Sequence, residues 1–165
     1  MEKLSLFERV SLANQFRIRA KLEGDDHLSK FADILERGYV SLYPRVFEWI
    51  YDETPDAVGE EVQDIFTMYR ALERAYEAGA TPAAEAFHPR FDGFDGNHDP
   101  HFGIASFLID DLNLWSEQKD RPRNSHSMAT IGTYREMLKV WNDLGRPFPL
   151  TQDQVNQIAV GPSKK

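Results

Sequence analysis

The stretch from Val58 to Tyr76 limits the fold of this chain more than any other part of the sequence. Six apolar or aromatic residues recur in it at spacings of four and three: Val58, Val62, Ile65, Tyr69, Leu72 and Tyr76. This spacing places all six on one face of an α-helix. Thr54 and Pro55 suit the cap and the first turn of that helix, and Gly79 suits its end. We expect this helix to form the centre of the hydrophobic core.

The amino-terminal segment shows the same helical punctuation. Ser5 and Glu8 form a capping-box pattern, which opens a helix that runs to about Leu22. One face of this helix carries Phe7, Ser11, Asn14, Ile18 and Leu22. We expect Asn14, placed among apolar neighbours, to be a buried amide that is satisfied by hydrogen bonds.

Helical signals continue along the rest of the chain. Further helices are expected at about 27–37, around Pro44, after the Asp99-Pro100 pair, at about 127–144 and after the cap Thr151. No alternating apolar and polar run with hairpin turns predicts a strand. We therefore predict an all-α fold of six to eight helices, organised as a single domain over residues 1–160 with a frayed tail at 161–165.

Composition narrows the class of protein and its partners. The 165 residues are 41% hydrophobic and carry a net charge of −8, which suits one globular domain and disfavours nucleic acid and anionic membranes as partners. The amino terminus has no apolar run long enough for a signal peptide or a membrane span. The chain has no cysteine, which fits a reducing compartment. We expect a cytoplasmic protein that binds neither membranes nor nucleic acid directly.

The motifs that identify common enzyme classes are absent. The sequence has no phosphate-binding GxxxxGK[ST] loop, no GxGxxG, no GxSxG and no HExxH. One ExxH pair occurs, Glu85 with His88, but a di-iron site needs two such pairs and two further glutamates. We predict no cofactor, and a non-enzymatic protein is favoured over an enzyme.

The segment FDGFDGNHDPH, residues 91–101, is the best candidate for a functional site. Its glycines allow tight turns, and it leads into a helix amino terminus, where backbone N–H groups attract polar and anionic groups. We expect a pocket for a small polar or anionic ligand. Its residues come from this loop, from a second segment before a helix and from the long helix: Asp92, Asp95, Asn97, His101, Asn124, His126, Tyr69 and Arg70.

Three other hypotheses fit these residues. His98, His101 and Asp95 carry groups that suit a divalent transition metal, which gives a metal-dependent hydrolase as one alternative. Asp95 and Asn97 also suit a purely structural turn, in which their side chains bond to nearby backbone amides. A third hypothesis is a homo-oligomeric structural or interaction protein, because 3 Trp, 6 Tyr and 11 Phe are more than a small core needs.

Five short blocks resemble the YfbU family of bacterial proteins, and they span essentially the whole chain in the family's order. They are ERVSLANQ (8–15), ILERGY (34–39), MYRALE (68–73), GFDGN (93–97) and MLKVW (137–141). The resemblance implies an all-helical domain of about this length with a poorly characterised function. It also implies ligand binding, because some members of the family are fused to a helix-turn-helix DNA-binding domain. It implies no catalytic residue.

Overall fold

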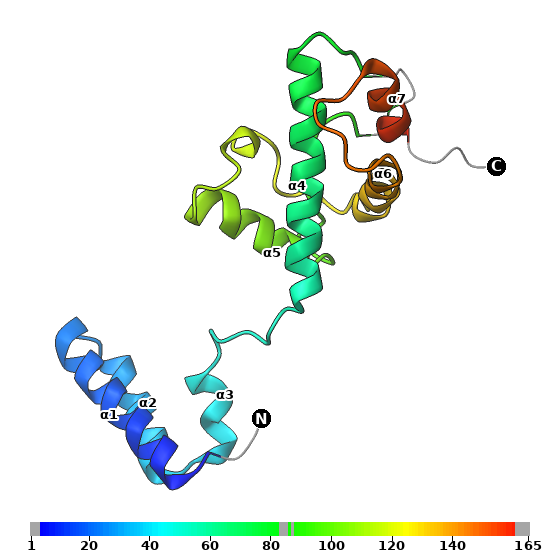
Figure 1. Cartoon of the computed structure of the whole chain (residues 1–165). Helices are drawn as coiled ribbons and strands as arrows, with labels where there is room; N and C mark the ends of the chain where they lie inside the picture. Colours follow the sequence, from blue (N-terminus) through cyan, green and yellow to red (C-terminus); the bar gives the residue numbers. More distant parts are fainter. Residues whose placement is uncertain (1–3, 83–85, 87, 161–165) are drawn as a thin grey trace. The chain divides into compact units, whose positions relative to one another are not determined.

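The computed structural model describes residues 4–82, 86 and 88–160 (Figure 1). These residues form seven α-helices, a few 3-10 and π turns, and no strand beyond one isolated backbone bridge. The prediction of an all-α fold with six to eight helices is therefore confirmed. By its internal contacts the chain falls into two compact units, Met1–Glu53 and Thr54–Lys165, and each has a hydrophobic core. The single-domain organisation stays a prediction, and the expected tail at 161–165 lies outside the described residues.

The first unit is a helical hairpin with a short third helix. It contains α1 (Leu6–Glu23), α2 (Asp26–Arg37), the 3-10 turn η1 (Val40–Leu42) and α3 (Tyr43–Val46). The capping box forms as predicted, because the Ser5 hydroxyl accepts from the Glu8 amide and the Glu8 carboxylate accepts from the Ser5 amide at 2.7 Å. Gly24 and Gly38 end α1 and α2 in the left-handed conformation.

Contacts between α1 and α2 decide which side of α1 is buried. Arg9 of α1 donates from Nε to the Leu35 carbonyl at 2.8 Å, in addition to the Gly38 amide that this carbonyl accepts at 3.2 Å near the end of α2. Ala13 and Ala20 are buried on the same side, where small side chains let the two helices approach. Asn14 lies on the opposite side and is exposed. The expectation of a buried amide at this position was wrong, because the alanine side of the helix, and not its larger apolar side, packs on α2.

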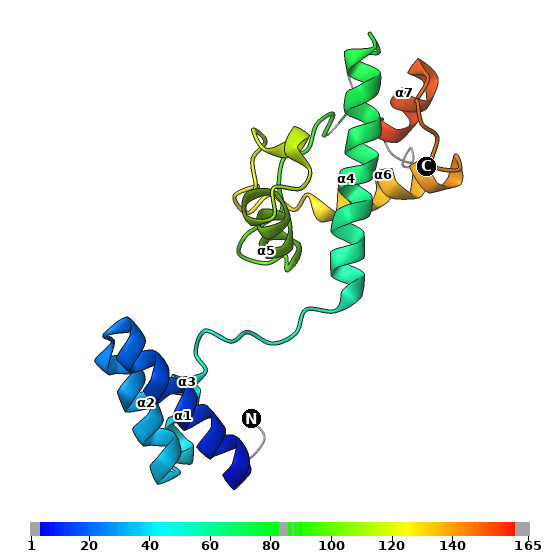
Figure 2. The same ribbon diagram turned by 60° about the vertical axis from the view of Figure 1, so that its left-hand side comes forward.

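The second unit is built around α4 (Asp56–Glu77), which lies between α5 (His101–Ser106) and the pair α6 (Ile131–Asp143) and α7 (Gln152–Val160) in both views (Figures 1 and 2). The π turn η2 (Phe107–Asp111) and the 3-10 turn η3 (Ser116–Gln118) complete it. Four residues of the predicted stripe are fully buried, namely Val62, Ile65, Tyr69 and Leu72. The end residues Val58 and Tyr76 are only half-buried. The sequence pattern thus locates the core of this unit correctly.

Two helices begin later than the sequence pattern predicts, because a competing turn takes the preceding residues. α5 begins at His101, since the Asp99 carboxylate accepts the Asp95 amide at 3.0 Å and is not used to cap the helix. α6 begins at Ile131, since residues 125–128 form a turn in which the Ser125 hydroxyl donates to the Met128 carbonyl at 2.6 Å. Both turns border the loop that contains residues 91–101.

Two glutamates on α4 have opposite electrostatic environments. The Glu61 carboxylate accepts hydrogen bonds from Arg135 Nε at 2.7 Å and Arg135 Nη2 at 2.8 Å. It also contacts His101 Nε2 at 2.7 Å. The Arg135 hydrogen bonds lower the pKa of Glu61 and outweigh its partial burial. Burial raises the pKa of Glu73, although Arg121 Nε lies 3.3 Å from its Oε1 and Gln118 donates to its Oε2 at 3.3 Å.

We expect Glu61→Gln and Glu73→Gln to change stability in opposite directions at pH 7. A lowered folded-state pKa means that ionised Glu61 stabilises the fold above its unfolded pKa, so Glu61→Gln lowers the free energy of unfolding. A raised folded-state pKa means that ionised Glu73 destabilises the fold, so Glu73→Gln raises it. Each effect is on the order of 1 kcal/mol, the usual size for a single substitution that removes a hydrogen-bonded or partly buried charge.

Urea unfolding of the two variants and the unsubstituted protein at pH 7 and at pH 4 measures both effects. The Glu73 difference shrinks as the pH falls through its raised folded-state pKa towards the ordinary value of 4.5. The Glu61 difference shrinks at lower pH, from 4.5 down through its lowered folded-state pKa. Effects of the same sign at pH 7 would contradict the opposite environments described above.

Candidate functional site

The loop at residues 91–96 is joined to the segment 123–125 by backbone hydrogen bonds. The Phe94 amide donates to the Arg123 carbonyl, and the Ser125 amide donates to the Phe94 carbonyl, both at 2.9 Å. Phe91 and Phe94 are fully buried, so the loop is also fixed in the core by two aromatic rings. Segments 30 residues apart in the sequence are thereby held side by side.

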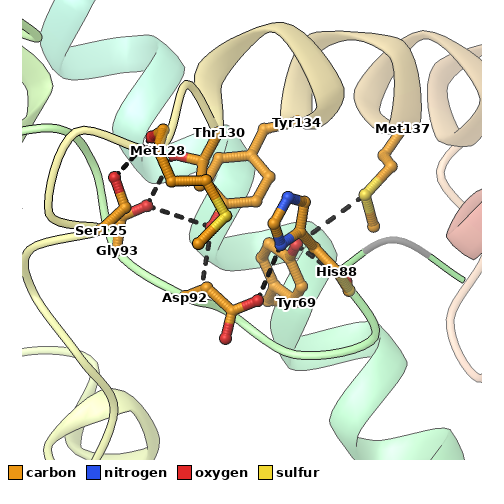
Figure 3. Close-up of polar contacts among 9 residues, drawn as sticks. All are labelled: Tyr69, His88, Asp92, Gly93, Ser125, Met128, Thr130, Tyr134 and Met137. Atoms are coloured by element: carbon orange, nitrogen blue, oxygen red, sulfur yellow. Dashed lines mark hydrogen bonds and ion pairs between the residues drawn. The ribbon is translucent and has the colours of Figure 1, made fainter.

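Buried hydroxyl groups of Thr130 and Tyr134 hydrogen-bond to this loop (Figure 3). Tyr134 Oη accepts the Asp92 amide at 3.0 Å and donates to the Gly93 carbonyl at 3.1 Å. Thr130 Oγ1 donates to the same carbonyl at 2.8 Å. Burial raises the pKa of Tyr134, so the phenol stays neutral and keeps the proton that it donates.

An imidazole–carboxylate pair lies beside these hydroxyl groups (Figure 3). His88 Nδ1 lies 2.7 Å from Asp92 Oδ2, and the edge of the imidazole ring packs against Tyr134 (Figure 3). Tyr69 Oη donates to the His88 carbonyl at 3.1 Å, which fixes the backbone from which the imidazole projects. The His88 side chain is 11% exposed and that of Asp92 is 43% exposed. The His88 imidazole is thus held in the protein interior, whereas the Asp92 carboxylate is open to solvent.

An open pocket of about 460 Å³ lies against this pair. It is lined by His88, Asp92, Pro122, Asn124, Ser125, His126 and Met128. The Asn124 side-chain carbonyl accepts the Gly96 amide at 3.2 Å and the His126 amide at 2.8 Å, which holds the rim in place. His126 and Ser127 both have positive φ angles, 52° and 69°. Non-glycine residues in this conformation are uncommon and concentrate at functional sites.

Three of the eight residues predicted for the site line this pocket: Asp92, Asn124 and His126. Asp95 and Asn97 lie in the adjacent turn, where the Asn97 amide donates to Asp95 Oδ1 at 2.9 Å. This hydrogen bond is the main reason that the pKa of Asp95 is lowered, followed by the contact with His98. Asp95 and Asn97 therefore make the bonds that a structural turn requires.

The other three predicted residues face elsewhere. His101 is buried, stacks on Phe94 and contacts Glu61. Tyr69 is wholly buried in the core. Arg70 pairs with Glu117, stacks on the Trp115 ring at 4.1 Å and lines a different hollow of about 360 Å³.

His88 and Met128 are pocket residues that sequence reasoning did not include in the site. The only sequence signal for His88 was the Glu85–His88 pair, and Glu85 lies outside the described residues. The spacing of four between His88 and Asp92 is a weak signal in a loop with a proline and a glycine. The pairing becomes apparent only once the buried hydroxyl groups of α4 and α6 fix the loop.

The metal alternative finds no support in the described part of the chain. No group of three or more histidine, aspartate or glutamate side chains there is placed to hold a metal ion. His98 Nδ1 contacts Asp95 at 2.6 Å, whereas His101 turns to Glu61, so the three proposed ligands do not converge. The hypothesis of a metal-dependent hydrolase that uses His98, His101 and Asp95 as ligands is therefore wrong.

Comparison with known proteins places the chain in a family. The YfbU domain matches residues 1–160. The UPF0304 protein MJECS11 of Methanocaldococcus jannaschii is 31% identical over 165 aligned positions, which cover 94% of this chain and 98% of that protein. Among the described residues, no helix has both the length and the apolar character needed to cross a membrane. The sequence resemblance is thus confirmed over nearly the whole chain, and the protein belongs to the YfbU family.

Proposed function

We propose that this protein binds a small polar ligand in the pocket beside His88 and Asp92, and that it is a binding or regulatory protein. The observation that carries the proposal is the His88–Asp92 pair, fixed by buried hydroxyl groups and facing an open pocket. Preorganised polar groups beside an apolar wall are typical of small-molecule sites. Pro122 and Met128 supply that wall.

The chemistry of the pocket favours a ligand with a hydrogen-bond donor. The second carboxylate oxygen of Asp92 points away from the other labelled residues in Figure 3, and a carboxylate only accepts hydrogen bonds when ionised. The described lining residues include no lysine or arginine to balance an added negative charge. We therefore narrow the expected polar or anionic ligand to one that carries an amine or hydroxyl group.

The site fits a binding role better than a catalytic one. His88 and Asp92 resemble two parts of a nucleophilic triad, but Ser125, the hydroxyl-bearing residue of the pocket, donates to the Met128 carbonyl and not to His88. A nucleophile needs a base within hydrogen-bonding reach. We place this binding function in the cytoplasm, which the absence of cysteine supports.

The proposal is tested by screening the full chain against small amines, polyols and sugars, with thermal shift followed by calorimetry of each hit. A ligand at about 100 times its Kd should add roughly 2.7 kcal/mol of stability. Asp92→Asn keeps the side-chain shape but removes the charge, so we expect it to weaken binding about tenfold or more. Asp143→Asn, an exposed change on α6 outside the pocket, is the matched control and should leave binding unchanged.

Two results would overturn the proposal. One is that no amine, polyol or sugar stabilises the protein. The other is that a ligand binds Asp92→Asn as tightly as the unsubstituted protein, since its site would then lie elsewhere.

A further inference from the structure

A second hollow, of about 190 Å³, lies beside the carboxyl end of α4. All of its lining side chains are titratable: Glu73, Tyr76, Glu77, Arg90 and Arg121. The first three come from α4, and the two arginines come from the loop segments on either side of α5. This arginine hollow has no lining residue in common with the ligand pocket beside His88 and Asp92. It is therefore a separate place at which a polar group can bind.

The charges of the arginine hollow leave one positive charge without a counterpart. Glu77 pairs with Arg74 at 2.8 Å, so its charge is already balanced. The two arginines of the hollow then share the single carboxyl group of Glu73, which interacts electrostatically with both. Even with Glu73 ionised, the hollow has an excess of one positive charge, and one additional negative charge would balance it.

The polar groups of the hollow are also incompletely bonded to one another. Arg121 Nε lies 3.3 Å from Glu73 Oε1, whereas all other ion pairs between described residues measure 3.0 Å or less. The Glu73 side chain is only 12% exposed and that of Arg121 26%. The Tyr76 hydroxyl is buried and has no hydrogen-bond partner among the described residues. Buried polar groups are normally paired, so these groups have hydrogen-bonding capacity to offer a ligand.

We infer that the arginine hollow binds the carboxylate group of a small organic acid between Arg90 and Arg121. A guanidinium group matches a carboxylate with two parallel hydrogen bonds. A carboxylate also brings the one negative charge that the hollow lacks, whereas a phosphate dianion would add a second charge beside Glu73. The hollow is smaller than the roughly 300–1,000 Å³ of most ligand sites, so it fits an acid with few carbon atoms.

Glu73 competes with the bound carboxylate for Arg121, which makes binding depend on pH. Burial raises the pKa of Glu73, and a second carboxylate beside it favours its neutral form further. Neutral Glu73 releases Arg121 and donates a hydrogen bond instead of repelling the ligand. The affinity for a carboxylate therefore rises as the pH falls through the raised pKa of Glu73.

The other charged groups around Glu73 keep their charge near neutral pH. The arginines stay protonated, and burial raises the pKa of Tyr76 to about 12. Burial also disfavours ionised Glu117, but its hydrogen bond with Arg70 outweighs this and lowers the pKa of Glu117. Glu77 is exposed and paired. Histidine side chains titrate in this range, so the pH dependence belongs to Glu73 only if Glu73→Gln removes it.

Titration of the full chain with sodium acetate at constant ionic strength tests the inference, with NMR of the arginine Nε–Hε groups as the readout. We expect saturable shifts of the Arg90 and Arg121 signals with a Kd on the order of 1–10 mM at pH 6. The affinity should be about threefold or more lower at pH 7.5. Sodium phosphate, titrated in the same way, should bind more weakly than acetate at pH 7.5.

Three variants separate the arginine hollow from general charge effects. Arg121→Gln should weaken acetate binding about tenfold. Lys139→Gln removes the same charge from an exposed position on α6 outside the hollow, and it should leave binding unchanged. Glu73→Gln removes the competing charge, so it should tighten acetate binding about tenfold at pH 7.5 and abolish the difference between the two pH values.

Four results would overturn the inference. The first is that acetate at about 100 mM shifts neither arginine signal. The second is that Lys139→Gln weakens binding as much as Arg121→Gln, since acetate would then be a general counter-ion. The third is that phosphate binds more tightly than acetate at pH 7.5. The fourth is that Glu73→Gln weakens acetate binding, since Glu73 would then hold the ligand. Asp92→Asn should leave acetate binding intact, so this test does not depend on the ligand pocket.

Discussion

Replacement of Gly93 by alanine is expected to lower the free energy of unfolding by about 3 kcal/mol or more. Gly93 has a φ of 85°, which costs a side-chain-bearing residue roughly 1–2 kcal/mol. A Cβ at this position would also lie 2.5 Å from the Arg123 carbonyl oxygen and 2.6 Å from its carbon. Because these are backbone atoms, the two segments must separate. The hydrogen bonds between Phe94 and residues 123 and 125 would then weaken or break.

Gly79→Ala is the matched control for Gly93→Ala. Gly79 also has a positive φ, 103°, but a Cβ there meets nothing within 4 Å. Chemical unfolding of both variants separates backbone strain from steric overlap, and Gly79→Ala should lose only the strain, roughly 1–2 kcal/mol. Equal losses would show that the close approach of residues 93 and 123 does not matter for stability. The Gly93 variant should also bind the pocket's ligand more weakly, since Asn124 and Ser125 line that pocket.

Local sequence signals predicted the helices well because the bonds that start and end a helix involve neighbouring residues. The Ser5–Glu8 box and the turn in which the Gln154 amide donates to Thr151 Oγ1 at 3.3 Å both form between residues three apart. The buried stripe of α4 follows equally from periodicity. Asn14 was misplaced because periodicity shows which residues share a face but not which face meets a neighbour.

The site was less predictable because its contacts join residues far apart in the sequence. The bond from Tyr69 to the His88 carbonyl spans 19 residues, and the bond from the Asp92 amide to Tyr134 spans 42. Tyr69 was predicted as a residue that the long helix contributes to the pocket. Its hydroxyl does support the site, but it acts from within the core through the backbone of His88. A helical pattern alone does not distinguish these two positions.

The hydroxyl group of Tyr134 gives the second large prediction. We expect Tyr134→Phe to lower the free energy of unfolding by about 2 kcal/mol, the cost of leaving a half-buried amide without its acceptor. The lost hydroxyl accepts the Asp92 amide and donates to the Gly93 carbonyl. Thr130 still donates to that carbonyl, so the cost comes mainly from the Asp92 amide. Hydrogen exchange at that amide should become faster in the variant.

Tyr76→Phe provides the matched control, because it removes a phenol oxygen that is also buried but has no hydrogen-bond partner among the described residues. Burial raises the pKa of Tyr76 to about 12, and it raises the pKa of Tyr134 as well, so both phenols are neutral at physiological pH. Both substitutions therefore remove a neutral hydroxyl group, from the half-buried Tyr76 or from the buried Tyr134. Only the change at Tyr134 also removes hydrogen bonds to the described residues. We expect Tyr76→Phe to leave the urea midpoint unchanged or to raise it slightly. If both variants unfold at the midpoint of the unsubstituted protein, Tyr134 does not hold the loop, and the rigidity attributed to the His88–Asp92 pair loses its basis.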